Sequence, residues 1–216
     1  MFQAAYESPL HVPVAAWVGC AVAVAIALVR RRMVAYTAFF ALVCALDAWL
    51  TGPWTPLRAD SLATTAAGVI FVIAGDFRWF VLLARSARKK TTLAGVLIAL
   101  GLAFIVPVLA QIARAAGLSD MRKTFLAYEL LFFVLAIVMR AIVLPRRLPA
   151  SGAWRTFALR MTAFEITQYG LWAAADILLL ATGADAVYLL RMIPNLLYYA
   201  GFLIAATALA PRENDA

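Results

Sequence analysis

Seven long apolar stretches constrain the fold of this 216-residue chain more than any other feature of its sequence. A helix needs roughly 20 apolar residues to cross the roughly 30 Å hydrocarbon core of a bilayer. The stretches of about this length are residues 12–29, 34–51, 62–84, 91–113, 124–144, 158–181 and 186–209. They are continuous runs rather than short alternating strands, so we predict helices. The expected fold is all-α: one polytopic bundle of seven transmembrane helices over residues 1–216.

The composition independently indicates a membrane protein, with 66% hydrophobic residues, 14% charged residues and a mean hydropathy of +0.91. Residues 1–13 contain no basic residue, and the cluster Arg30–Arg32 follows the first apolar run instead of preceding it. We therefore expect a retained first helix and not a cleaved signal peptide. The many alanines and arginines are typical of a GC-rich bacterial genome, which suggests the bacterial cytoplasmic (inner) membrane.

The distribution of lysine and arginine predicts the orientation in the membrane, because these residues concentrate in cytoplasmic loops. With the N-terminus outside, thirteen of the nineteen basic residues fall on the cytoplasmic side, and the C-terminus is cytoplasmic. The net charge of +8 is scattered over several short loops and not gathered on one face. We therefore expect the lipid bilayer as the partner of these charges, and no binding to nucleic acid.

Several kinds of membrane-protein chemistry are excluded by residues that the chain lacks. Its single histidine, His11, precludes a histidine metal cluster, and no lysine lies in the stretch 186–209 where a retinal protein needs one. The sequence Ile73-Ala74-Gly75-Asp76 lacks the first glycine of the Gly-x-Gly-Asp motif of intramembrane aspartyl proteases. We assign no catalytic residue, no metal site and no cofactor, which favours a protein that is not an enzyme.

Polar residues form stripes along the last two predicted helices. On 158–181, side chains three and four residues apart share one face, namely Thr162, Glu165, Tyr169, Trp172 and Asp176. On 186–209, Arg191, Asn195 and Tyr198 do the same around Pro194, which leaves the carbonyl of Leu190 without its helical donor. Such stripes are expected to face protein or water and not lipid.

Asp76 is the most costly residue of the chain to place in a membrane. It lies in the inner half of 62–84, and an acid at such depth costs a few kcal/mol, so we expect it to be protonated, paired or hydrated. Arg78 is two residues away and is expected either to reach the cytoplasmic boundary or to meet Glu165. We predict a ligand site around Asp76 that also contains Glu165, Tyr169, Trp172, Asn195 and Tyr198.

A second group of charged residues is predicted to form an outer gate or ion pair. Asp176 and Arg191 lie at similar depth on either side of a short loop, so they are expected to pair, and the predicted gate comprises Asp47, Glu129, Asp176 and Arg191. A purely structural salt bridge is the alternative. Within the membrane zone, five acids face two arginines, and this excess favours protons or cations over anions.

Small residues recur at every fourth position on two helices. They are Ala15, Gly19, Ala23 and Ala27 on the first helix, and Gly95, Ala99 and Ala103 on the fourth. This spacing is typical of close helix packing, and a homo-oligomer contact through either face is the alternative. Cys20 and Cys44 are read as small core residues. Pro107 is expected to bend the fourth helix.

The tripeptide Ile193-Pro194-Asn195 resembles the Ile-Pro-Asn of the seventh helix in the SWEET sugar transporters, which share this length, helix number and orientation. The resemblance covers only this segment. The family's prolines in the first, second, fifth and sixth helices have no mid-helix counterparts here, since Pro13 and Pro145 lie at helix edges. We therefore assign the chain to no family on this basis.

These observations predict a membrane protein that binds or transports a small polar solute or cation, with possible proton coupling through Asp76. Two other classes stay open. One is a membrane sensor or accessory subunit whose basic surface around residues 140–160 docks a cytoplasmic partner. The other is an intramembrane lipid-modifying enzyme, which would need an acid pair open to the bilayer.

Overall fold

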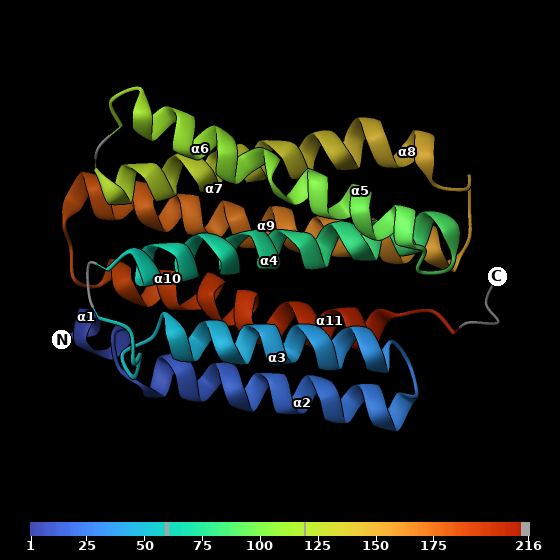
Figure 1. Cartoon of the computed structure of the whole chain (residues 1–216), viewed down its shortest axis with the longest axis horizontal. Coiled ribbons are helices and arrows are strands. Elements are labelled where there is room, and N and C mark those ends of the chain that lie inside the picture. The colour runs from blue at the N-terminus through green and yellow to red at the C-terminus, as the bar shows by residue number, and fades with distance from the viewer. Residues whose placement is uncertain (59–60, 119, 213–216) are drawn as a thin grey trace. The chain divides into compact units, whose positions relative to one another are not determined.

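Helices form nearly all of the protein. The computed structural model describes residues 1–58, 61–118 and 120–212 (Figure 1). Helix accounts for 82% of the chain and no strand occurs in these described ranges, so the all-α prediction is confirmed. The contacts divide the chain into two compact units, and a single domain over residues 1–216 stays a prediction.

Unit 1 comprises Met1–Gly75 and Leu178–Ala210. Its helical elements are α1 (Phe2–Tyr6), the π-helical turn η1 (Leu10–Val14), α2 (Ala15–Arg30), α3 (Val34–Leu50), the first half of α4 (Leu62–Arg88), α10 (Val187–Leu196), the π-helical turn η3 (Leu197–Gly201) and α11 (Phe202–Leu209). Residues Arg31 and Met33 adopt left-handed backbone conformations that end α2 and begin α3. This tight connection returns α3 along α2, and the two helices run side by side (Figure 1).

Unit 2 comprises Asp76–Ile177 together with Pro211 and Arg212. Its elements are the second half of α4, α5 (Leu93–Ala103), α6 (Ile105–Ala115), α7 (Met121–Val138), the π-helical turn η2 (Met139–Val143), α8 (Leu144–Arg147) and most of α9 (Ala153–Thr182). Side-chain caps set two of the helix starts, because Thr92 accepts from the Gly95 amide and Asp120 from the Lys123 amide. Aromatic residues dominate the core of this unit, and Trp79, Phe80, Phe132 and Phe157 are almost completely buried.

Small residues bring the helices of unit 1 close together. A methyl group built on Gly19 of α2 would lie only 2.1 Å from the Cβ of Ala200 in η3. Ala23 and Ala27 continue this face of α2 and have no exposed area. In unit 2, Ala99 and Ala103 on the fourth predicted helix are buried as well. The expected packing role of the small residues is confirmed, whereas a homo-oligomer contact through either face stays a prediction.

Two prolines coincide with interruptions of long helices. α5 ends and α6 begins around Phe104, three residues before Pro107, so the predicted break in the fourth helix is confirmed. Pro194 lies inside α10, and the π-helical turn η3 begins three residues later. The two cysteines, Cys20 and Cys44, are buried and reduced, and the Cys20 thiol donates to the carbonyl oxygen of Tyr199 at 3.7 Å.

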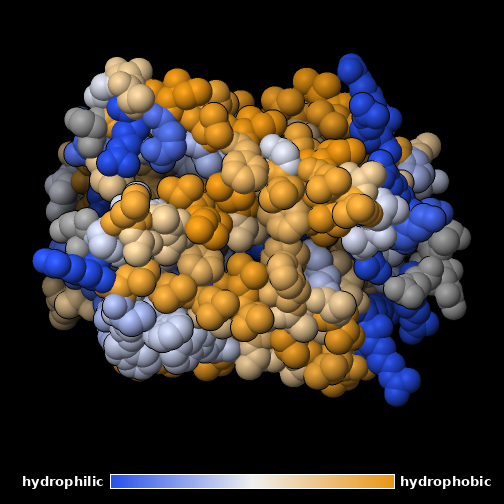
Figure 2. Space-filling model, in the orientation of Figure 1, coloured by the Kyte–Doolittle hydropathy of each residue, from blue (hydrophilic) through white to orange (hydrophobic). Residues whose placement is uncertain are grey.

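Within the described residues, five helical segments are long and apolar enough to cross a membrane. They are Leu10–Arg30, Leu62–Arg88, Leu93–Ala115, Met121–Arg147 and Val187–Leu209. Hydrophobic side chains also cover much of the face visible in Figure 2. In unit 2, for example, Leu97, Val108 and Ile112 are each about half exposed, as expected for side chains that contact lipid. Membrane insertion is therefore supported for these five segments.

The two other predicted spans are also helical but differ from these five. The stretch 34–51 corresponds to α3, which is apolar but only 17 residues long. The stretch 158–181 lies within α9, which is 30 residues long but carries the polar stripe. The predicted helix positions thus agree with the structure to within a few residues, whereas length and composition give five candidate spans in the part of the chain that the structure describes.

Candidate functional site

The predicted ligand residues divide between the two units. Asp76, Glu165, Tyr169 and Trp172 belong to unit 2, whereas Asn195 and Tyr198 belong to unit 1. Each group has its own contacts within its unit.

In unit 2, Asp76 accepts hydrogen bonds from two tyrosines on neighbouring helices. Tyr128 Oη of α7 donates to Asp76 Oδ1 at 2.6 Å, and Tyr169 Oη of α9 donates to the same oxygen at 2.9 Å. The two hydroxyl oxygens are themselves 3.0 Å apart. Asp76 is 1% exposed, and its Oδ2 atom is buried without a hydrogen-bond partner in the described part of the chain. A buried acid is thus held by one oxygen only.

The number of protons in this cluster is informative. Three oxygen pairs lie within hydrogen-bonding distance, but the hydroxyls of Tyr128 and Tyr169 supply only two protons. A third proton on Asp76 would allow every pair to be hydrogen bonded. It would also spare the membrane interior a charged carboxylate whose second oxygen lacks a donor.

Arg78 and Glu165 provide the other charges next to Asp76. Arg78 is 1% exposed and Glu165 is 2% exposed, and both interact electrostatically with Asp76. Arg78 also interacts electrostatically with Glu165, and whether it meets Glu165 directly or reaches the cytoplasmic boundary stays a prediction. With all three groups ionised, two acids face one arginine, which leaves one negative charge in excess.

Aromatic rings enclose the acid cluster. The Tyr169 ring stacks on Phe132 with centroids 4.1 Å apart, and the Trp172 ring meets it edge-on at 5.4 Å. Trp79 packs against Phe132 from α4 at 5.4 Å. These contacts fix the Tyr169 hydroxyl toward Asp76 and keep the cluster away from lipid.

Unit 2 contains further buried polar atoms with spare hydrogen-bonding capacity. The side-chain amide of Gln168 and the indole Nε1 of Trp79 are fully buried, and neither has a hydrogen-bond partner within the described ranges. Leaving such a group unsatisfied costs about 1–3 kcal/mol, so apolar residues would be the more stable choice at both positions. This unit is more polar inside than packing requires.

In unit 1, the two remaining ligand candidates bond to different parts of the chain. Asn195 Nδ2 donates to Tyr6 Oη at 3.2 Å, and Tyr198 Oη donates to the backbone carbonyl of Phe71 at 3.1 Å. Tyr198 also fills the space beside Gly75, where an added methyl group would lie 2.3 Å from its hydroxyl. Asn195 lines a pocket of about 380 Å³, whereas Tyr198 acts in packing and is absent from the lining of that pocket.

The predicted gate residues also fall in both units. In unit 2, Arg122 Nη1 lies 3.4 Å from Asp176 Oδ1, so α7 supplies a partner that the sequence did not suggest. In unit 1, Thr51 Oγ1 donates to Asp47 Oδ1 at 2.9 Å, and the Arg191 guanidinium lies 5.8 Å from the centre of the Tyr6 ring. The expected pairing of Asp176 with Arg191 joins residues of different units and stays a prediction. Glu129, the fourth gate residue, is buried in α7.

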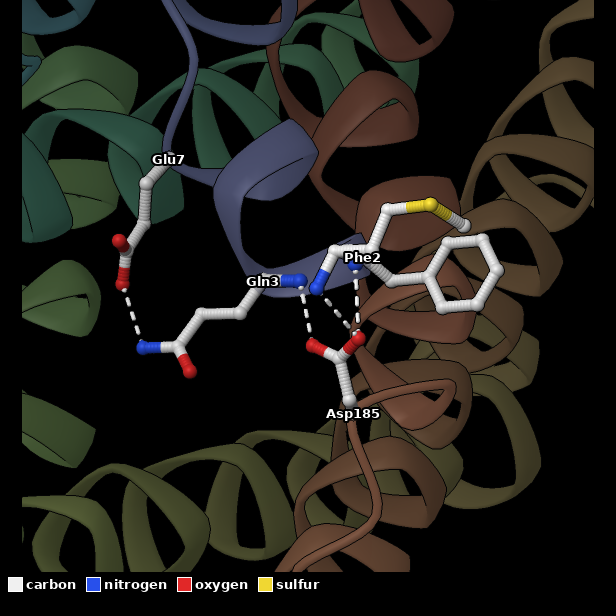
Figure 3. A network of polar contacts seen from close by, with 5 residues as sticks. Phe2, Gln3, Glu7 and Asp185 are labelled. Atoms are coloured by element: carbon white, nitrogen blue, oxygen red, sulfur yellow. Dashed lines mark hydrogen bonds and ion pairs between the residues drawn. The ribbon is translucent and has the colours of Figure 1, made fainter.

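Asp185 anchors the N-terminal segment of unit 1. Its carboxylate accepts from the Met1 amino group at 2.9 Å and from the amides of Phe2 and Gln3 at 2.8 Å each (Figure 3). The bond from the amino group, followed by those from the two amides, lowers the pKa of Asp185 from 3.8 to about 2. Asp185 thereby fixes α1, which carries Tyr6 to its bond with Asn195.

Four residues that contact the predicted candidates or line the pocket of unit 1 were not predicted from the sequence. They are Tyr128, Arg122, Tyr6 and His11. Tyr128 directly precedes the predicted Glu129, and it lies one helical turn after the buried Thr124, so α7 periodicity carries a weak signal for it. Tyr6 and His11 lie outside the apolar stretches, where helical periodicity gives no information.

Known proteins add no functional assignment to this geometry. Comparison of the chain with protein-family models, with curated proteins and with solved structures gives no match. The Asp76 cluster and the pocket of unit 1 are therefore the features that can indicate a function.

Proposed function

We propose that the chain is an integral membrane protein with seven spans, an outer N-terminus and a cytoplasmic C-terminus, in the inner membrane of a bacterium. Five segments already have the necessary length and composition. At 17 residues, α3 meets the lower limit for a span. On α9, the polar residues are buried, while Leu171 and Leu178 on the opposite face are each more than a third exposed, which supports contact with lipid there.

We infer that this protein binds or moves a small polar solute or cation, and that Asp76 carries a proton or cation in the process. The observation that carries this proposal is the geometry of Asp76. It is a 1% exposed acid on a membrane-spanning helix, held by two tyrosine hydroxyls through one oxygen, and its second oxygen has no partner in the described ranges. Ionisable groups retained at such depth usually have a function.

The charge balance of the cluster favours a proton as the first occupant. Among Asp76, Glu165 and Arg78, one proton bound to Asp76 gives net neutrality, because the opposite charges of Glu165 and Arg78 then balance. Release of that proton creates a negative charge that a cation can compensate. A site with this property can couple the binding of a cation or polar solute to proton release.

The proposed ligand-contacting residues are Asp76, Glu165, Tyr169 and Trp172 in unit 2, with Asn195 and Tyr198 in unit 1. Asp47, Glu129, Asp176 and Arg191 are proposed as the gate. We add Tyr128 to the ligand-contacting residues of unit 2, because its hydroxyl makes the shorter of the two bonds to Asp76.

Transport by reconstituted protein tests this proposal. Proteoliposomes containing an internal pH dye are screened with sugars, amino acids, amines and monovalent cations for solute-driven pH changes. We expect Asp76→Asn to abolish the pH change produced by the active solute. Asp120→Asn is the matched control, because asparagine caps a helix as well as aspartate does and Asp120 lies at the start of α7.

The proposed carrier role is wrong if Asp76→Asn leaves both solute flux and its pH dependence unchanged. A protein in which none of the tested solutes causes a pH change, while a second protein copurifies with it from native membranes, would instead support the sensor or accessory class.

A further inference from the structure

Unit 1 contains a pocket of about 380 Å³, which lies in the size range of small-molecule sites. It is lined by Tyr6, Glu7, His11, Val12, Thr51, Gly52, Pro53, Asn195 and Tyr199. None of these residues belongs to the Asp76 cluster. Asn195 is also a residue of the proposed transport site, but binding in this pocket is measured by itself, whether or not the chain transports a solute.

Three segments far apart in the sequence converge on this pocket. The first is the N-terminal segment with α1 and η1, the second follows α3, and the third includes the end of α10 and the start of η3. The first and third are joined by the Asn195–Tyr6 hydrogen bond and by Asp185, which caps α1. The walls of the pocket are thus fixed by specific contacts.

His11 contributes a buried acceptor to the lining. It is 4% exposed, and its Nδ1 atom lies 2.7 Å from the carbonyl oxygen of Tyr6. A carbonyl oxygen only accepts, so Nδ1 must carry the proton and Nε2 of the neutral ring must be an acceptor. His11 Nε2 is buried without a hydrogen-bond partner in the part of the chain that the structure describes. The lone pair of this unsatisfied acceptor adds partial negative charge behind the pocket wall.

The charges around the pocket favour a cation. Glu7 is the charged residue in its lining, and its side chain is exposed apart from the bond that Oε1 accepts from Gln3. Asp47 lies behind the lining, where Thr51 donates to it. Arg191 is the opposing charge, over the Tyr6 ring and outside the lining. Two acids therefore outweigh one arginine, and the tyrosine rings add faces that attract cations.

We propose that this pocket binds a small organic ammonium ion. Glu7 accepts a hydrogen bond from the ammonium group, while the rings of Tyr6 and Tyr199 lie against its carbon chain. Asn195 orients Tyr6 through its side-chain amide.

Three probes of the same length isolate the contribution of the charged end group. Calorimetric titration of the protein in lipid nanodiscs is carried out with 4-aminobutanol, 1,4-butanediol and 4-hydroxybutyrate. The ammonium, neutral and carboxylate end groups differ, while all three probes have a four-carbon chain with a hydroxyl group at the other end. We expect saturable binding of 4-aminobutanol, with weaker binding of butanediol and no binding of hydroxybutyrate.

Glu7→Gln is the principal variant, because the exposed side chain can be changed without disturbing the core. We expect a loss of about three- to fivefold in 4-aminobutanol affinity, as is typical of an exposed charge interaction. Asp120→Asn in unit 2 should leave the affinity unchanged. Absence of binding by 4-aminobutanol, equal binding of the three probes, or an unchanged affinity in Glu7→Gln would each overturn the proposal. Melting curves of both variants show whether they are folded.

Discussion

The helices of the two units pack in different ways. Unit 1 relies on small residues, such as Gly19 against Ala200, and places its polar groups around a pocket near the N-terminal segment. Unit 2 has an aromatic core around Phe132 that encloses ionisable groups, including Asp76 and Glu165, with almost no exposure. In lipid, helix association depends on close contact and on polar interactions between helices. Unit 1 mainly uses the first and unit 2 the second.

The two functions that we propose for this chain divide in the same way between the units. A pocket lined by an exposed acid, Glu7, and by tyrosines suits binding from the aqueous side, because a ligand can enter without unpacking helices. A sealed acid cluster suits a proton, which needs no cavity. Three measurements test whether the two units differ in this way.

The largest effect is expected where close packing leaves no space. We predict that Gly19→Leu destabilises the protein by about 3 kcal/mol, because its Cβ alone would lie 2.1 Å from that of Ala200. The free energy of unfolding in mixed detergent measures this loss. Gly68→Leu is the control, since no atom lies within 4 Å of an added methyl group there, and its effect should be within about 0.5 kcal/mol. Equal stability of the two variants would mean that unit 1 does not depend on close contact.

The sequence was sufficient to predict which segments are helical and which face of α9 is buried. Thr162, Glu165, Tyr169 and Asp176 are all at most 2% exposed, in agreement with the predicted stripe. Periodicity identifies a buried face because lipid and protein select different side chains. It does not identify the helix that packs against that face.

The sequence did not predict which residues far apart in the chain contact each other. Tyr128 and Asp76 are 52 residues apart, and Arg122 and Asp176 are 54 apart, so their meeting depends on how α7 packs against its neighbours. The pocket of unit 1 depends on α1, which folds back to Asp185 at the far end of the chain. A single sequence contains no direct signal for either arrangement, and the expected site therefore combined residues from both units.

The next effect is expected at the two tyrosines of unit 2. Tyr128→Phe and Tyr169→Phe should each destabilise the protein by about 1 kcal/mol, because each removes one hydrogen bond to Asp76 Oδ1. Since the hydroxyls also lie 3.0 Å from each other, the double variant should show a coupling energy of at least about 0.5 kcal/mol. Unfolding of the two single variants and the double variant gives this value.

Tyr188→Phe provides the control for loss of a hydroxyl group. The Tyr188 ring packs against Tyr6, and its hydroxyl makes no hydrogen bond within the described residues, so no change beyond about 0.5 kcal/mol is expected. Additive effects of the Tyr128 and Tyr169 substitutions would show that the two hydroxyls act independently and would remove the case for a shared network.

The smallest effect is a local pH response of unit 1. The pKa of Asp185 is lowered to about 2 by bonds from the N-terminal amino group and two amides, so its contribution is complete above pH 4 and is lost as the pH falls toward 2. Amide hydrogen exchange of residues 2–6, corrected for the intrinsic rate, should therefore accelerate between pH 4 and pH 2. Asp185→Asn should lack this transition, and an identical profile in both proteins would contradict the anchoring role.

The central claim is that Asp76 holds a proton in the resting protein. Infrared spectroscopy of the protein in lipid at neutral pH tests it directly, because a protonated carboxylic acid has a carbonyl stretch separate from that of a carboxylate. We expect such a band in the unmodified protein and its loss in Asp76→Asn, with the band retained in Asp120→Asn. Spectra without a carboxylic acid band, or with a band that persists in Asp76→Asn, would contradict it.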